Sequence, residues 1–167
     1  MAGRPCRTLF LCTGNSARSI LAECLLNRLG RGAYLAFSAG SHPKGAVHPE
    51  AIRMLQGLGH DTTRLASKGW DVFAAPGAPP LDLVITVCDA AAGETCAIWP
   101  GAPLRAHWSI PDPAAADDRQ APAAFRRAYR LLEKRISKLA ALDPAALNAA
   151  TLRAVSEPNE ETLNVEG

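Results

Sequence analysis

The segment from Asp82 to Cys88, D-L-V-I-T-V-C, constrains the fold more than any other part of the sequence. Its apolar side chains are nearly continuous rather than alternating with polar ones, which is typical of a strand buried on both faces. Strands of this kind belong to parallel sheets, because the helices that connect parallel strands cover both faces of the sheet. This segment therefore predicts an α/β protein with a parallel sheet.

The rest of the chain alternates between strand and helix patterns. Short apolar runs predict further strands at residues 7–12, 33–39 and 105–108. Helices are predicted after the first two of these strands, and a long apolar stripe predicts another helix between Phe125 and Leu139. Strands that alternate with helices predict a doubly wound sheet of four parallel strands flanked by helices.

Length and composition favour one compact domain. The chain has 167 residues, of which 48% are hydrophobic and 20% charged. Such values are ordinary for a globular protein and exclude a disordered or collagen-like chain. We expect a single α/β domain over residues 1–141. Residues 142–167 are rich in alanine and then acidic, and we expect a C-terminal extension that is partly helical or disordered.

Charge and hydropathy argue against two classes of partner. The sequence carries 18 Lys and Arg residues against 16 Asp and Glu residues, a net charge of +2. Its one dense basic cluster, within residues 126–138, includes Glu133, and we interpret it as the solvated face of a helix rather than a nucleic-acid patch. No apolar run approaches the roughly 18–20 residues that cross a bilayer. We expect a monomer with no nucleic-acid or membrane partner.

The five cysteines are Cys6, Cys12, Cys24, Cys88 and Cys96. Their number is odd and no apolar stretch near the N-terminus resembles an export signal, so we expect a cytoplasmic protein whose thiols stay reduced for packing or reactivity. The spacing of Cys88 and Cys96 differs from the C-x2-C pattern of zinc sites, and the histidines form no cluster. No metal and no cofactor are therefore predicted. Cys24 falls on the apolar face of a predicted helix and is assigned to the core.

The segment from Cys12 to Ser19, C-T-G-N-S-A-R-S, carries the clearest chemical pattern. The cysteine ends a predicted strand, and Arg18 opens a predicted helix. The small, turn-prone residues between them can direct their backbone N–H groups inward, which creates a binding site for a tetrahedral oxyanion. The predicted oxyanion-binding residues are Thr13, Gly14, Asn15, Ser16, Ala17 and Arg18.

The same positive field is expected to lower the pKa of Cys12 and make its sulfur a nucleophile. Arg18 adds a bidentate fork for the oxyanion, and Ser19 is placed to hydrogen-bond the sulfur. A Cys-x5-Arg spacing by itself is weak evidence. The alternative interpretation is a buried cysteine at the end of a strand, followed by an ordinary capped helix.

A nucleophile that attacks an oxyanion needs an acid to protonate the departing oxygen. Asp112, in the sequence Pro111-Asp112-Pro113, is the candidate, although an aspartate between prolines is more often only a turn residue. Ligand sites of parallel sheets form outside the carboxyl ends of the strands. Because Cys12, Cys88 and Asp112 all lie at or just beyond such ends, we expect them at one edge of the sheet.

These residues together resemble a known family. The loop from Cys12 to Ser19, with Asp112-Pro113 further along, is similar to the low molecular weight protein tyrosine phosphatases and to their relatives, the thiol-linked arsenate reductases. The resemblance covers residues 8–140 and implies that fold. Two departures favour the reductases: Ala17 replaces a second loop cysteine, and alanines 114–115 replace aromatic residues that clasp a phosphotyrosine ring.

The region from Cys88 to Cys96 is also similar to the redox segment of the arsenate reductases. The resemblance implies reduction of arsenate to arsenite by a Cys12–Cys88–Cys96 disulfide relay, with thioredoxin or glutaredoxin and glutathione as the electron donor. The eight-residue separation requires the intervening segment to fold back before a disulfide can form, because the two Cα atoms must approach within about 7 Å.

Three other interpretations stay open at this point. In the first, the chain is a tyrosine phosphatase in which Cys88 and Cys96 are passive. In the second, it is a non-catalytic module that binds an oxyanion or a phosphopeptide. Within any of these, Cys88 can be a core residue at the end of a strand and Cys96 a loop thiol without a role.

Overall fold

The structure, a computed structural model, describes residues 4–89, 99 and 101–156 of the chain. Its sheet has four parallel strands in the order β2-β1-β3-β4. The strands are β1 (Cys6–Cys12), β2 (Tyr34–Gly40), β3 (Leu83–Thr86) and β4 (Leu104–His107). The predicted α/β fold with a four-stranded parallel sheet is confirmed.

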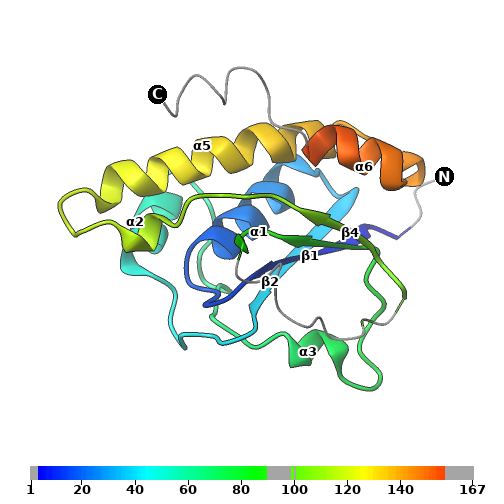
Figure 1. Cartoon of the computed structure of the whole chain (residues 1–167), viewed down its shortest axis with the longest axis horizontal. Helices are drawn as coiled ribbons and strands as arrows, with labels where there is room; N and C mark the ends of the chain where they lie inside the picture. Colours follow the sequence, from blue (N-terminus) through cyan, green and yellow to red (C-terminus); the bar gives the residue numbers. More distant parts are fainter. Residues whose placement is uncertain (1–3, 90–98, 100, 157–167) are drawn as a thin grey trace.

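Helices connect these strands and lie on both sides of the sheet (Figure 1). They are α1 (Arg18–Leu29), α2 (Pro49–Gly57), α3 (Asp71–Ala74), α5 (Ala121–Ala140) and α6 (Ala149–Ser156), with 3-10 turns at Pro113–Ala115 and Pro144–Ala146. In Figure 1, α5 and α6 lie above the sheet and α3 lies below it. Helix α1 packs on β1 and β2, α5 packs on α1, and α6 packs on β4.

The hydrophobic core is divided between the two faces of the sheet. The larger part lies under α1, α5 and α6 and includes the fully buried Phe10, Trp108 and Phe125. A smaller cluster on the other face contains Val84 and Trp99. All four residues of β3 are buried, as the continuous apolar pattern predicted. The strand is shorter than the predicted 82–88, so Cys88 lies just beyond its carboxyl end.

The described part of the C-terminal extension, residues 142–156, packs on the same core as the sheet. Leu152 and Val155 of α6 are buried in the larger cluster. The indole nitrogen of Trp108 donates a hydrogen bond to the hydroxyl of Ser156 at 2.9 Å. The hydroxyl of Tyr34 donates to the carbonyl of Leu142 at 3.0 Å. Helix α6 lies in this extension, and the segment after residue 156 lies outside the described residues.

The basic cluster predicted within residues 126–138 lies on α5. Arg126, Arg127, Arg130 and Lys134 are exposed, and Glu133 is exposed among them. Among the described helices, none combines the length and apolar character needed to span a bilayer.

We predict that Leu152→Ala destabilises the protein by about 2–5 kcal/mol, because Leu152 is 2% exposed and its removal leaves a cavity between α6 and the core. Urea unfolding followed by circular dichroism measures the change. Leu35→Ala is the matched control, because Leu35 is 38% exposed and its loss should cost less than about 1 kcal/mol. Equal effects of the two substitutions would show that α6 contributes little to the core.

Candidate functional site: an oxyanion loop with two thiols

Residues 13–17 form the loop that joins β1 to α1, and the carbonyl groups of this loop are bonded away from its concave side. Thr13 accepts a hydrogen bond from the amide of His42 at 2.9 Å, and Gly14 accepts one from the amide of Lys44 at 2.9 Å. Ser16 accepts one from the amide of His48, also at 2.9 Å. The segment 42–48 therefore fixes the outer side of the loop.

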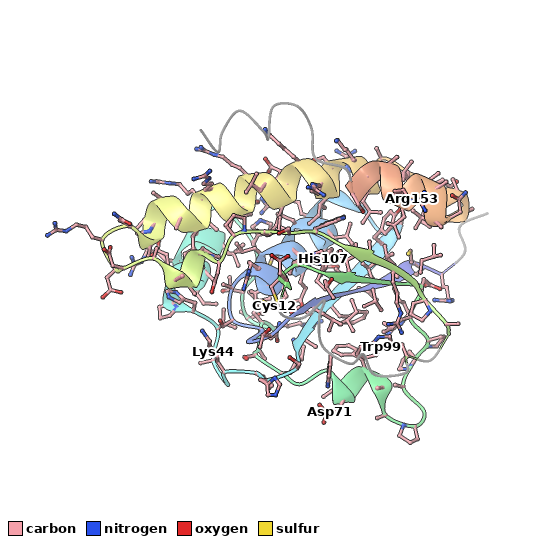
Figure 2. All side chains as sticks on the ribbon, in the orientation of Figure 1. Cys12, Lys44, Asp71, Trp99, His107 and Arg153 are labelled. Carbon is pink, nitrogen blue, oxygen red and sulfur yellow. The ribbon has the colours of Figure 1, made fainter. Side chains whose placement is uncertain are left out.

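This bonding determines where the amides of the loop point. In a trans peptide the N–H group of one residue lies opposite the carbonyl of the residue before it, and no cis peptide occurs among the described residues. The N–H groups of Gly14, Asn15 and Ala17 are therefore directed to the concave side. The amide of Gly14 donates a hydrogen bond to the sulfur of Cys12. Such a set of inward amides at the start of a helix can hold a tetrahedral anion over Cys12; Figure 2 places Cys12 at this junction.

Asn15 stabilises the conformation of the loop from inside. Its backbone φ is 45°, a left-handed conformation that asparagine adopts more readily than most residues. Its side chain is fully buried; the carbonyl oxygen accepts a hydrogen bond from the amide of Lys68 at 2.9 Å, and the amide nitrogen donates to the hydroxyl of Ser19 at 2.8 Å. The Ser19 hydroxyl keeps its own proton available for a further acceptor.

Gly40 lets the loop pack against the end of β2. A Cβ atom at this position would lie 2.4 Å from the carbonyl oxygen of Thr13 and 3.0 Å from the amide nitrogen of Asn15. Neither Gly40 nor the segment 42–48 was predicted from the sequence to be part of the site. Nothing in the local sequence signals them, because their contacts with the loop are formed between backbone groups distant in the chain.

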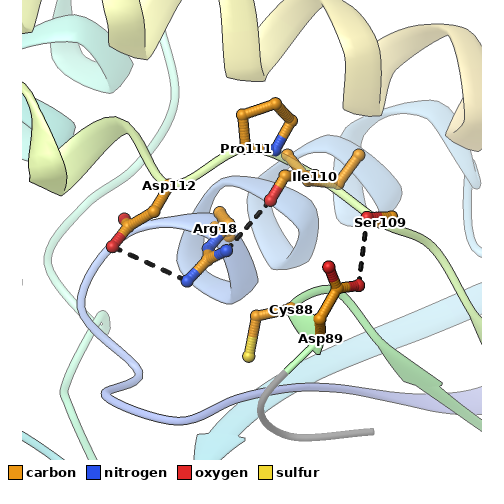
Figure 3. A pocket seen from close by; sticks show the side chains of 7 residues that line it. All are labelled: Arg18, Cys88, Asp89, Ser109, Ile110, Pro111 and Asp112. Atoms are coloured by element: carbon orange, nitrogen blue, oxygen red, sulfur yellow. Dashed lines mark hydrogen bonds and ion pairs between the residues drawn. The ribbon is translucent and has the colours of Figure 1, made fainter.

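Arg18 reaches from the start of α1 toward the segment that follows β4. One terminal nitrogen donates to the carbonyl of Ile110 at 2.9 Å, and the other lies 3.8 Å from a carboxylate oxygen of Asp112 (Figure 3). The Nε atom of Arg18 is buried and has no hydrogen-bond partner among the described residues. A buried donor left in this way is costly, and a bound anion would satisfy it.

The structure brings Cys12 and Cys88 together at the carboxyl ends of β1 and β3. Both side chains are buried, at 5% and 1% exposure, and their thiols are hydrogen-bonded to each other. The hydroxyl of Thr13 also lies 3.6 Å from the sulfur of Cys88. Asp112 lies at the same edge, so the three residues expected there are neighbours. Cys96 lies outside the described residues.

The pKa of Cys12 is raised from its ordinary value, first by the hydrogen bond with Cys88 and then by burial, while Arg18 and the amide of Gly14 lower it less. The expectation of a lowered pKa is therefore wrong for this arrangement. That expectation was based on the loop and the helix and did not include the hydrogen bond with Cys88. Two thiols in contact can carry at most one negative charge between them, because a second charge would repel the first.

Beside Cys88 and Arg18 is an open cavity of about 430 Å³. It is lined by Arg18, Cys88, Asp89, Ser109, Ile110, Pro111 and Asp112 (Figure 3). None of these residues is aromatic. Asp89 was not identified from the sequence, where its only signal is its position directly after Cys88. Within the described part of the chain, no group of three or more histidine, cysteine or acidic residues is arranged to hold a metal ion.

The sequence model of the family described as low molecular weight phosphotyrosine protein phosphatase matches residues 7–153. The chain belongs to this family. The family resemblance found in the residues of the loop is thereby confirmed over nearly the whole described chain. The match includes all four strands and most of α6.

Individual relatives within the family are named arsenate reductases. The arsenate reductase of Halalkalibacterium halodurans is 36% identical over 133 residues, which are 78% of this chain and 92% of that protein. The solved arsenate reductase of Archaeoglobus fulgidus superposes with a TM-score of 0.65 at 28% identity, covering 81% of this chain and 99% of that one.

A third relative is named for the electron donor on which it depends. A thioredoxin-dependent arsenate reductase of Corynebacterium glutamicum superposes with a TM-score of 0.61 at 26% identity, covering 83% of this chain and 62% of that one.

We predict that Cys88→Ala lowers the pKa of Cys12, because the substitution removes the largest cause that raises it. A lower pKa gives more thiolate at neutral pH, so alkylation of Cys12 by iodoacetamide should be about tenfold faster or more at pH 7, with its midpoint at lower pH. Mass spectrometry of the peptide that contains Cys12 measures the rate.

Cys24→Ala is the control for this prediction. Burial raises the pKa of Cys24 to about 12, and its side chain packs in the core under α5 rather than at the loop. The variant should leave the alkylation profile of Cys12 unchanged. An unchanged profile in Cys88→Ala would show that the second thiol does not control the first.

Proposed function

We propose that this chain reduces arsenate to arsenite, with Cys12 as the nucleophile and Cys88 and Cys96 as the thiols that supply and pass on the electrons. The observation that carries the proposal is the contact between the thiols of Cys12 and Cys88 at the oxyanion loop. Hydrolysis of a phosphate ester needs one nucleophile and water, whereas reduction of arsenate needs two electrons, which two thiols provide by becoming a disulfide.

The loop supports binding of the substrate. The inward amides of Gly14, Asn15 and Ala17 and the unpartnered Nε of Arg18 provide donors for the oxygens of a tetrahedral anion above the sulfur of Cys12. In the proposal the binding residues are those predicted from the sequence: Thr13, Gly14, Asn15, Ser16, Ala17 and Arg18. The hydroxyl of Ser19 donates a hydrogen bond to the sulfur as the sulfur becomes nucleophilic.

In the first step the thiol of Cys12 passes its proton to an oxygen of the bound arsenate, its sulfur forms a bond to arsenic(V), and the bond from arsenic to one hydroxyl oxygen breaks. Asp112 protonates the oxygen that departs as water. Its position supports this role, because it lines the cavity next to Arg18 while its other carboxylate oxygen is held by the amide of Ala114 at 3.0 Å. No oxidation state changes in this step.

In the second step the deprotonated sulfur of Cys88 attacks the sulfur of Cys12. The sulfur–arsenic bond breaks, its electron pair remains on arsenic, and arsenite leaves as arsenic(III) while the two cysteines become a disulfide. The burial and contact of the two thiols support this order. Once Cys12 is bonded to arsenic it carries no negative charge, so it no longer opposes ionisation of Cys88.

In the third step Cys96 attacks Cys88, which frees Cys12 and leaves a Cys88–Cys96 disulfide. An external dithiol reduces this disulfide and completes the cycle. We propose thioredoxin as this donor, because one of the relatives is named for its dependence on thioredoxin. Glutaredoxin with glutathione is the alternative donor. We further propose a monomer that works in the reducing cytoplasm, where the disulfide is returned to thiols.

The tyrosine phosphatase alternative has less support. A pocket for a phosphotyrosine ring is expected to have aromatic or broad apolar walls, and the cavity beside the loop is lined mainly by polar residues, with Ile110 and Pro111 at one side. A non-catalytic binding module would bind an oxyanion without need for the second thiol.

We predict arsenate-dependent oxidation of NADPH in the presence of thioredoxin and thioredoxin reductase, and slower or no oxidation with glutathione and glutaredoxin. Cys12→Ser, Cys88→Ser and Cys96→Ser should each reduce turnover by about 100-fold or more, because each interrupts electron transfer. Hydrolysis of an aryl phosphate should survive in Cys88→Ser and Cys96→Ser if the loop keeps residual phosphatase chemistry.

Cys24→Ala is again the matched thiol control and should retain full turnover. Unimpaired arsenate turnover in both Cys88→Ser and Cys96→Ser would contradict the proposed disulfide relay. Efficient hydrolysis of aryl phosphate without arsenate reduction would favour the phosphatase, and activity toward neither substrate would favour the binding module.

We predict that Asp112→Asn slows arsenate turnover by about 10²–10⁴-fold, since an amide cannot protonate the departing oxygen. The substitution should lower kcat and remove the limb of the pH profile of kcat that reports the acid. The circular dichroism spectrum should stay unchanged. Asp117→Asn, on the exposed turn before α5, is the control and should leave turnover unchanged. An unchanged kcat in Asp112→Asn would show that another group protonates the oxygen.

A further inference from the structure

Asp89 is a carboxylate at the rim of the cavity beside the oxyanion loop, and it has no part in the three steps above. It lines the same cavity as Arg18 and Asp112 (Figure 3). One of its oxygens, Oδ1, accepts hydrogen bonds from Nε2 of His107 at 2.8 Å and from the hydroxyl of Ser109 at 3.0 Å. Asp89 is thus held from β4 and the residues that follow it.

The second partner of His107 makes this arrangement rigid. Its Nδ1 atom lies 2.7 Å from the hydroxyl of Thr86, at the end of β3. The imidazole therefore bridges the ends of two neighbouring strands and presents Nε2 to the carboxylate. Oδ2 of Asp89 has no hydrogen-bond partner among the described residues and remains available to a ligand.

The carboxylate is ionised under ordinary conditions. Hydrogen bonds from His107 and Ser109 lower the pKa of Asp89, and the nearby charge of Arg18 lowers it further. An ionised carboxylate can only accept hydrogen bonds. Placed beside an anion site, it repels a ligand oxygen that carries no proton, and it binds a ligand oxygen that carries one.

Tetrahedral oxyanions differ in this property. Sulfate carries no hydroxyl at neutral or mildly alkaline pH, whereas phosphate and arsenate keep at least one, and arsenite is a neutral molecule with three. Phosphate and sulfate are otherwise close in size, shape and charge when the pH is mildly alkaline. A fixed carboxylate beside the site disfavours the analogue that lacks the matching proton, because it repels that charged oxygen and forms no hydrogen bond with it. The preference is moderate, because the side chain of Asp89 is 78% exposed and solvent screens its charge.

We propose that Asp89 is a specificity-determining residue of the oxyanion site, which accepts a hydrogen bond from a hydroxyl of the bound anion and so favours arsenate and phosphate over sulfate. His107 and Ser109 are its positioning residues. The inference rests on the proposed anion site at residues 12–18 and adds its selectivity. The role of Asp112 is separate, because Asp112 donates a proton in the proposed reaction whereas Asp89 accepts a hydrogen bond from the ligand.

Protection of Cys12 from iodoacetamide measures anion binding without arsenate, without an electron donor and without turnover. The rate of alkylation of the Cys12 peptide is followed at pH 8 against the concentration of sodium phosphate or sodium sulfate, at constant ionic strength. In the natural protein, phosphate should protect at lower concentration than sulfate. In Asp89→Asn the ratio of the half-protecting sulfate concentration to the half-protecting phosphate concentration should fall by about threefold to tenfold, because the amide can donate to sulfate.

Asp89→Ala provides a second variant, in which the acceptor and its charge are lost without a new donor. Its sulfate-to-phosphate ratio should also fall below that of the natural protein. His107→Gln, which loses the imidazole bridge to Thr86, should give a smaller change in the same direction. Glu133→Gln is the matched control, because it removes one exposed carboxylate from α5 and alters net charge equally. Its ratio should equal that of the natural protein.

The outcomes separate this inference from the proposed function. An unchanged sulfate-to-phosphate ratio of half-protecting concentrations in both Asp89 variants overturns the role of Asp89 while the anion site stands. Absence of protection by either anion overturns the anion site, and the inference with it. A lowered ratio in a protein that fails to reduce arsenate supports the role of Asp89 and counts against the reductase.

Discussion

The bonding of the loop carbonyls to the segment 42–48 is the interaction on which the site depends. Three amides of that segment hold three loop carbonyls on the outer side, and the planar trans peptides then direct the loop amides inward. Gly40 allows β2 to approach closely enough for this arrangement. An anion site of this kind is built from backbone groups, so its chemistry depends on the fold as much as on the side chains of the loop.

The pair formed by Cys12 and Cys88 places a second constraint on the chemistry. Buried thiols in contact resist a second ionisation, so their reactions have to occur in sequence. Formation of a bond between Cys12 and a substrate atom removes its charge and releases Cys88 to react. The order of the proposed relay follows from this electrostatic coupling. The same feature explains why an argument from the loop and the helix alone gave the wrong direction for the pKa of Cys12.

Periodicity was sufficient to predict the sheet. The continuous apolar segment that contains β3 required burial on both faces, and the structure buries it between α1 and α5 on one side and the cluster with Trp99 on the other. The ends of elements were less predictable, as β3 stops two residues before Cys88. A strand ends where its ladder ends, which depends on neighbouring strands rather than on its own residues.

The sequence by itself determined the fold class and the chemical content of the loop, because hydrophobic periodicity and a Cys-to-Arg segment between a strand and a helix are local patterns. The sequence also predicted that Cys12, Cys88 and Asp112 lie at one edge of the sheet, whereas only the tertiary structure decided the individual contacts made there. The thiol of Cys88, the carbonyl of Ile110 that holds Arg18 and the bridge from His107 to Asp89 come from segments that are distant in the chain. Their contacts arise from the parallel order of the strands, which brings the carboxyl ends of β1, β3 and β4 to one edge.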